Sequence, residues 1–126
     1  MRKPTRSALT AVSLTAAVTA VIVLPAAPAL ADSTSCSISN GVYSCSTGTV
    51  RANSVTHSVR VIARKAVFGG SVTCRVHDSA NGVTVGQVKV SAPQLSESRT
   101  IGGLYGRYFA VCINGSRNGG GGDLEN

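Results

Sequence analysis

The side chains that could carry out acid–base or nucleophilic chemistry are few in this sequence. It has two histidines, His57 and His77, and its central part offers only two carboxylates, Asp78 and Glu97. Hydrolysis of a glycoside requires two placed carboxylates, whereas we expect both of these to lie in turns. No Gly-x-Ser-x-Gly motif, which would expose a nucleophilic serine, accompanies the histidines. We therefore predict that the chain has no catalytic residues and is not an enzyme.

Four cysteines are the other residues with distinctive chemistry: Cys36, Cys45, Cys74 and Cys112. A structural zinc site usually contains a Cys-x-x-Cys pair, and that spacing does not occur here. We therefore predict neither a metal nor any other cofactor. An even number of cysteines in a small exported domain indicates disulfide bonds instead.

The pairing of these cysteines is predicted from a turn that lies between the first two. Asn40-Gly41 favours a type I′ hairpin turn, because both central residues of that turn need a positive φ. With this turn, Cys36 lies opposite Cys45 at a non-hydrogen-bonded position, where two antiparallel backbones are close enough for a disulfide. We predict the pairs Cys36–Cys45 and Cys74–Cys112.

The amino-terminal segment has the three parts of a secretory signal. Three basic residues, Arg2, Lys3 and Arg6, lie within the first six positions. An apolar run covers residues 8–24, and Ala29 and Ala31 have the spacing of a cleavage site. The apolar run is short for a membrane span and contains hydroxyl residues. We predict that residues 1–31 are a signal peptide and that the mature chain is secreted, in free form or at the cell surface, without a membrane span.

The charge of the predicted mature chain indicates which classes of partner it could bind. Three of the twelve basic residues lie in the leader, so nine remain against five acidic ones, a net charge of +4. This balance suits an extracellular protein with an acidic face or an anionic cell-surface polymer. The basic residues are dispersed and do not alternate with aromatic residues, so we exclude nucleic acid as a partner.

Apolar and polar residues alternate with a period of two through most of the mature chain, which predicts β-strands. Val55, His57, Val59, Val61 and Ala63 would share an inward face, as would Val72, Cys74 and Val76, and as would Tyr108, Ala110 and Cys112. We expect Gly86 to mark a bulge, 78–82 to be a turn, and 96–98 to be part of a longer connection. We predict an all-β fold, a small antiparallel sandwich of six to seven strands of the immunoglobulin-like kind.

The last thirteen residues, 114–126, contain four consecutive glycines and little apolar mass. We predict that they form a flexible tail. The predicted organisation is therefore a signal peptide (1–31), a disulfide-bonded domain (32–113) and a glycine-rich tail (114–126).

Two segments carry the residue types that most often anchor protein interfaces, which are tyrosine and arginine. One is the predicted hairpin tip, with Asn40, Gly41 and Tyr43, and the other contains Tyr105 and Arg107. We predict these five residues as the candidate binding surface.

The order of motifs between Cys36 and Cys112 resembles that of a known family. A short-range cysteine pair is followed by Val59-Arg60-Val61, by a strand with one cysteine, and by Gly-Arg-Tyr-Phe-Ala-Val-Cys at 106–112. This order is similar to the tendamistat family of small secreted α-amylase inhibitors. The resemblance implies a six-stranded antiparallel sandwich with disulfides between the first and second and between the third and fourth cysteines.

The activity of the tendamistat family is not implied by this resemblance. That family inhibits amylase through a Trp-Arg-Tyr triplet between its first two cysteines. Residues 37–44 contain Tyr43 but neither Trp nor Arg, and the whole chain lacks Trp. The resemblance therefore concerns the scaffold and the secreted location.

Two hypotheses for function follow from the sequence. The first is a secreted, non-catalytic binding module, one form of which is an inhibitor of an extracellular hydrolase. The alternative is an adaptor in a cell-surface, spore-associated or multi-protein toxin-type assembly, in which the tail, 114–126, orders on a partner.

Overall fold

A computed structural model of the chain describes residues 32–126, so the predicted signal peptide, residues 1–31, lies outside the described residues. Residues 32–126 contain no helix long and apolar enough to cross a membrane. Within this range the chain forms nine strands: β1 (Ser33–Ser37), β2 (Ser44–Ser46), β3 (Val50–Arg51), β4 (Val59–Arg64), β5 (Val72–Asp78), β6 (Thr84–Val90), β7 (Ser96–Ile101), β8 (Arg107–Ile113) and β9 (Gly121–Glu125).

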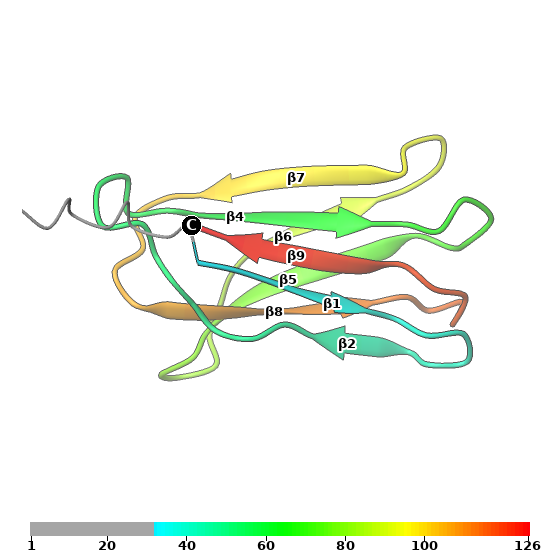
Figure 1. Cartoon of the computed structure of the whole chain (residues 1–126), viewed down its shortest axis with the longest axis horizontal. Helices are drawn as coiled ribbons and strands as arrows, with labels where there is room; N and C mark the ends of the chain where they lie inside the picture. Colours follow the sequence, from blue (N-terminus) through cyan, green and yellow to red (C-terminus); the bar gives the residue numbers. More distant parts are fainter. Residues whose placement is uncertain (1–31) are drawn as a thin grey trace, which may run out of the picture.

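The strands form two antiparallel sheets that pack face to face (Figure 1). Sheet A has the order β1-β9-β4-β7, and sheet B has the order β2-β8-β5-β6, with the short β3 also paired to β8. The predicted class, a small antiparallel β-sandwich with two disulfides, is confirmed. Nine strands form rather than six or seven, partly because the predicted tail contributes β9.

The core lies between the sheets and follows the alternation in the sequence. Val61, Ala63, Val72 and Val76 are completely buried, and Val59 is 1% exposed. Burial of each valine side chain stabilises the fold by about 1.5–3 kcal/mol. The period of two therefore predicts the inward faces of β4, β5 and β8.

The prediction of inward positions was wrong for Val55 and His57, which precede β4. Val55 is 83% exposed, and His57 has a positive φ of 50°. The cause is local, because the Asn53 side chain accepts hydrogen bonds from the backbone N–H groups of Val55 (2.8 Å) and Thr56 (3.0 Å). This Asx-type turn curls the backbone out of the strand.

Two further features of the chain were predicted with different success. The bulge at Gly86 is confirmed, because the β5–β6 register shifts beside it and a Cβ there would lie 2.5 Å from Ile101 Cδ1. The prediction that residues 96–98 belong to a connection was wrong, since they pair with β4 as the first half of β7. These polar residues form a strand because β7 is an edge strand with an exposed surface.

The predicted disulfides, Cys36–Cys45 and Cys74–Cys112, are both present. Cys74 and Cys112 are register partners on β5 and β8 inside sheet B. Closing the two loops, of sequence separation 9 and 38, contributes roughly 2.7 and 4 kcal/mol on a chain-entropy model.

The geometry from which Cys36–Cys45 was predicted is wrong. A turn does form, with the Val42 N–H bonded to Ser39 O at 3.0 Å, but of its central residues only Gly41 has a positive φ. A type I′ turn needs a positive φ at both central residues. The strands on either side separate, since β1 pairs with β9 and β2 with β8. The Cys36–Cys45 disulfide therefore joins sheet A to sheet B and does not link two strands paired with each other.

The prediction of a flexible tail from 114 onward was also wrong. Gly121–Glu125 forms β9, which lies between β1 and β4 in sheet A, and Leu124 is completely buried. The glycines permit close packing here, because a Cβ on Gly122 would collide with Cys112 Sγ and one on Gly121 with Cys36 O. The domain therefore extends beyond residue 113, and the adaptor hypothesis loses the free tail on which it depended.

Candidate recognition site

The loops of the sandwich gather at two opposite ends, which are on the right and left of Figure 1. The right-hand end, which we call the Phe68 end, contains loops 38–43, 65–71, 91–95 and 114–120. The left-hand end, which we call the Tyr105 end, contains loops 52–58, 79–83 and 102–106. Each loop is therefore presented at one end by strands that are fixed in the core.

The structure divides the five predicted surface residues between these two ends. Asn40, Gly41 and Tyr43 lie at the Phe68 end, before β2, and the Tyr43 carbonyl accepts a hydrogen bond from Asn114 N at the far end of β8. Tyr105 precedes β8 and Arg107 begins it. The length of β8 separates the two groups, so the five residues do not form one patch.

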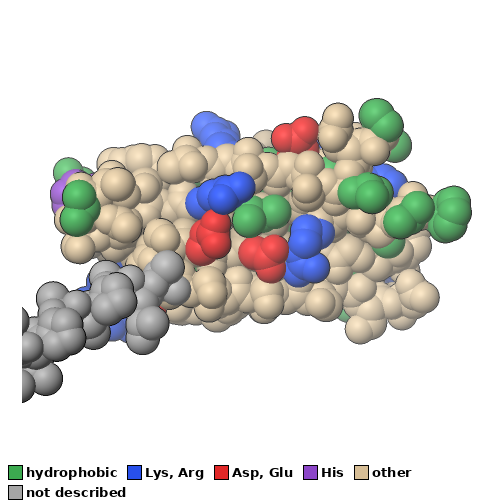
Figure 2. Space-filling model, turned by 45° about the horizontal axis from the view of Figure 1, so that its top comes forward, with side chains coloured by type: hydrophobic (Ala, Val, Ile, Leu, Met, Phe, Trp, Pro, Cys, Tyr) green, Lys and Arg blue, Asp and Glu red, His purple; other side chains and the backbone are tan. Residues whose placement is uncertain are grey.

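The Phe68 end exposes large apolar side chains from three loops. They are Val42 (45% exposed), Tyr43 (51%), Val67 (64%), Phe68 (97%) and Leu95 (49%). Figure 2 shows hydrophobic side chains gathered at this end of the molecule. Of these residues, only Tyr43 is predicted from the sequence to belong to a binding surface. One sequence feature indicates that Phe68 is exposed: Val67 and Phe68 directly precede Gly69-Gly70, so this apolar pair lies in a turn rather than in a strand.

Hydrogen bonds between neighbouring loops hold the Phe68 end in shape. Lys65 N donates to Leu95 O at 2.9 Å, which joins loop 65–71 to loop 91–95. Gly70 N donates to Asn118 Oδ1 at 2.8 Å, and Gly41 N donates to Arg117 O at 2.8 Å. Loop 114–120 is thereby bonded to two of the loops that carry the apolar residues.

Loop 114–120 is itself built around the buried side chain of Asn114, which is 0% exposed. Its Nδ2 donates to Asn118 Oδ1 (2.8 Å) and Gly119 O (2.7 Å), and its Oδ1 accepts from Ser116 N (2.9 Å). A buried amide with its polar atoms satisfied makes a loop rigid. The apolar side chains are therefore displayed on a preorganised support.

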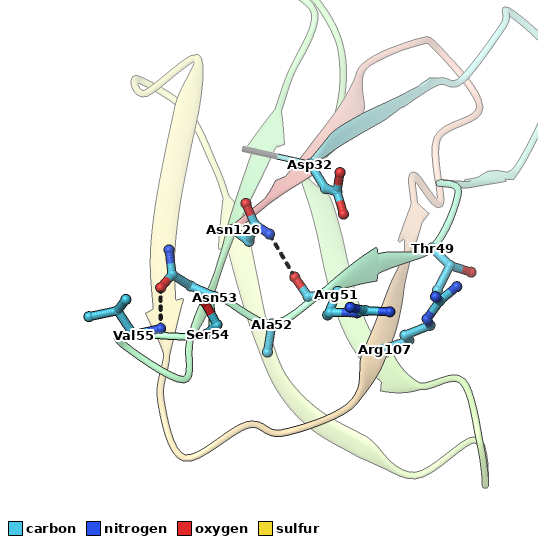
Figure 3. Close-up of a pocket in the computed structure, with 9 residues that line it drawn as sticks. All are labelled: Asp32, Thr49, Arg51, Ala52, Asn53, Ser54, Val55, Arg107 and Asn126. Atoms are coloured by element: carbon cyan, nitrogen blue, oxygen red, sulfur yellow. Dashed lines mark hydrogen bonds between the residues drawn. The ribbon is translucent and has the colours of Figure 1, made fainter. Parts of the chain in front are cut away.

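The Tyr105 end has a different character. Tyr105, which is 78% exposed, stacks on His57 with ring centroids 4.4 Å apart. Beside it is an open cavity of about 470 Å³, whose walls include Arg51, Arg107 and Asp32 (Figure 3). This end combines an aromatic pair with two guanidinium groups.

The two histidines take part in packing contacts. His77 stacks on Phe109 at 5.3 Å, and its Nδ1 lies 3.2 Å from Thr84 Oγ1. The adjacent Asp78 uses Oδ1 to accept the Ala80 N–H at 2.8 Å, which stabilises the turn. Within residues 32–126, neither imidazole has a hydrogen bond to a carboxylate, so this geometry does not provide a general acid–base pair.

One cluster in the described part of the chain has the composition of a metal site. The sulfurs of Cys36, Cys45 and Cys112 lie within 4.8 Å of one another. All three belong to disulfides, and a bridged sulfur is not the thiolate that binds zinc. The cluster reflects the stacking of two disulfides in the core.

Comparisons with known proteins support the fold. No family model and no curated protein matches the sequence. The crystal structure of the pre-peptidase C-terminal domain of a collagenase from Bacillus anthracis is similar, with a TM-score of 0.51 and 12% sequence identity, over 75% of this chain and 86% of that one. At this identity the likeness concerns the fold alone. The chain is thus a small disulfide-bonded β-sandwich, and the tendamistat resemblance receives no support beyond that class.

Proposed function

We propose that the mature chain is an exported, non-catalytic recognition module that binds an extracellular protein through the Phe68 end. The observation that carries this proposal is the exposure of five large apolar side chains on hydrogen-bonded loops. Clustered apolar side chains at a surface are typical of interaction sites. A side chain such as Phe68, exposed to 97%, can lose nearly all of its contact with water when a partner covers it.

The rigidity of the loops that carry these apolar side chains also favours binding. A partner that docks on flexible loops must order them, which costs about 0.5–1.5 kcal/mol for each immobilised side chain. The loops of the Phe68 end already have inter-loop hydrogen bonds, and two disulfides hold the strands below them. A partner therefore loses less binding free energy on ordering the loops of the Phe68 end.

The structural neighbour and the disulfides support an extracellular, non-catalytic role. The neighbour is described as a C-terminal domain of a collagenase, so this sandwich can occur as an accessory part of an enzyme. Disulfides form and persist in oxidising compartments. One form of the proposed function is inhibition of an extracellular hydrolase, with the Phe68 end covering the enzyme's surface.

Affinity capture tests this proposal. The oxidised chain 32–126 is immobilised and exposed to culture fluid, and the captured proteins are assayed for hydrolase activity and its inhibition. We expect a specific protein to be retained by the unmodified chain and lost by Val67→Ser/Phe68→Ser. The matched control is Val55→Ser/Val83→Ser, which removes two exposed apolar side chains, 83% and 57% exposed, at the Tyr105 end.

The control should retain the same protein as the unmodified chain. Equal loss with both double variants would show general stickiness, and retention by Val67→Ser/Phe68→Ser would show that the Phe68 end does not bind. Either result contradicts the proposal, as does the capture of carbohydrate alone.

A further inference from the structure

The outward-facing side chains of sheet B have an unusual charge distribution. Alternation along β8, β5 and β6 places the residues that do not enter the core on one outer surface. We call this surface the basic face. Its charged residues are Arg51 on β3, Arg107 on β8, Arg75 on β5 and Lys89 on β6. Among the described strand residues of this face there is no Asp or Glu.

Three of the four acidic residues of the strands, Glu97, Asp123 and Glu125, lie on sheet A. The fourth, Asp78, ends β5 of sheet B in register with the buried Tyr108, so it is not part of the outward alternation. Asp123 and Glu125 on β9 form ion pairs with Arg64 (2.9 Å) and Arg60 (3.3 Å). Figure 2 shows basic and acidic side chains next to each other in the middle of this surface. The positive charge of the domain is therefore compensated on sheet A and uncompensated on the basic face.

Two arginines of the basic face are neighbours. Arg51 and Arg107 are register partners of β3 and β8, so their side chains leave the sheet on the same side, and both line the open cavity of Figure 3. Like charges directly opposite each other destabilise a sheet. Asp32 also lines this cavity, but neither arginine has a salt bridge within residues 32–126. An anionic group between the two guanidinium groups would relieve their repulsion.

The remaining cations continue from this pair along the sheet. Within residues 32–126, the one hydrogen bond of the Arg75 side chain goes to a neutral partner, Gln87 Oε1, at 3.3 Å. Lys89 is the register partner of Thr73, which is in turn opposite Ile113 at the far end of β8. Lys89 is therefore level with Ile113, six residues along β8 from Arg107. With a rise of about 3.3 Å per residue, the basic face extends roughly 20 Å along the strands. A ligand that contacts all four cations must be extended and carry repeated negative charges.

The chemistry of the face favours phosphate as the repeated group. Three of the four cations are arginines, whose planar guanidinium matches the oxygens of a phosphate bidentately. Recognition of single-stranded bases relies on exposed aromatic side chains on which the bases stack. The strands of this face carry one aromatic ring other than histidine, Phe109, which is only partly exposed and stacks on His77. The exposed Tyr105 of loop 102–106 lies outside the strands of the face and is itself stacked on His57.

We infer that the basic face binds a linear phosphodiester polymer that lacks bases, such as poly(glycerol phosphate), and that one phosphate lies between Arg51 and Arg107. Binding is electrostatic, because the polymer releases counterions when its phosphates meet the four cations. The Phe68 end is a separate surface, so the domain can bind this polymer and a protein at once.

The test is a titration of fluorescently labelled poly(glycerol phosphate) with the oxidised chain, followed by anisotropy at several salt concentrations. We expect saturable binding that weakens as salt is added. Arg51→Gln/Arg107→Gln should weaken it about tenfold and reduce its salt dependence. The control Arg60→Gln/Lys65→Gln removes the same charge outside the basic face and should change affinity less than about twofold.

Folding of the variants is checked by their thermal midpoints. Arg51→Gln/Arg107→Gln removes a like-charge contact, so it should be at least as stable as the unmodified chain. If it does not fold, Arg75→Gln/Lys89→Gln takes its place in the titration. Val67→Ser/Phe68→Ser should bind the polymer normally, which separates this inference from the proposed function.

Three results would overturn the inference. One is an absence of binding at low salt. Another is an equal loss of affinity in the basic-face and control variants, which would indicate net charge alone. The third is binding of polygalacturonate, single-stranded DNA or polyglutamate as tight as that of poly(glycerol phosphate), because the face would then recognise another anion or a polypeptide.

Discussion

At the scale of single residues, glycine has two opposite uses in this chain. Gly41 and Gly82 supply a positive φ in turns, and an added Cβ at either position would meet no atom of residues 32–126 within 4 Å. Gly121 and Gly122 lie inside a strand, where an added Cβ would collide with neighbouring atoms. The sequence does not distinguish these uses, because a run of glycines has the composition of a linker whether it is solvated or packed.

Gly122→Ala tests the packing role of this glycine. The new methyl group would collide with both Cys74 and Cys112, in a core that is fixed by their disulfide. We expect the free energy of unfolding, measured by urea denaturation, to fall by about 1–3 kcal/mol or more. Gly102→Ala is the control, because the added Cβ would have no atom of the described part of the chain within 4 Å, and it should change stability by less than about 0.5 kcal/mol. Equal effects would contradict the packing role.

At the scale of elements, the sequence predicted turns and the bulge correctly, whereas it did not predict which strands pair with each other. The turns at 39–42 and 78–82 and the bulge at Gly86 depend on the residues within them, and each forms where it was predicted. The strand that pairs with β1 is β9, which lies about ninety residues further along the chain and cannot be identified from the residues of β1 itself. The turn at Asn40-Gly41 therefore indicated the correct disulfide for the wrong reason, since β9 and β8 take the strands that the hairpin would have paired.

Leu124→Ala tests whether β9 is an integral strand. Leu124 is completely buried in the centre of sheet A, so its truncation leaves a cavity and should lower the free energy of unfolding by about 2–5 kcal/mol. Leu95→Ala is the same change at a residue that is 49% exposed, and we expect it to cost less than half as much. A Leu124→Ala variant as stable as the unmodified chain would mean that residues 121–125 are a tail after all.

At the scale of the whole molecule, the sandwich separates its surfaces. The Phe68 end and the basic face belong to different parts of the fold, and the tightly packed disulfides lie between the sheets. The sequence could indicate that Tyr43 and Tyr105 lie near turns. It could not show that they lie at opposite ends, because that depends on how many strands cross the sandwich between them. Phe68 was missed because a single exposed aromatic leaves no periodic pattern.

The most direct test of the proposed recognition role is hydrogen exchange of the captured complex, followed by mass spectrometry. Binding through the Phe68 end predicts that backbone amides in loops 38–43, 65–71 and 91–95 exchange more slowly in the complex, while loops 52–58 and 102–106 keep the exchange rates of the free domain. Protection confined to loops 52–58 and 102–106, with no change around Phe68, would contradict it.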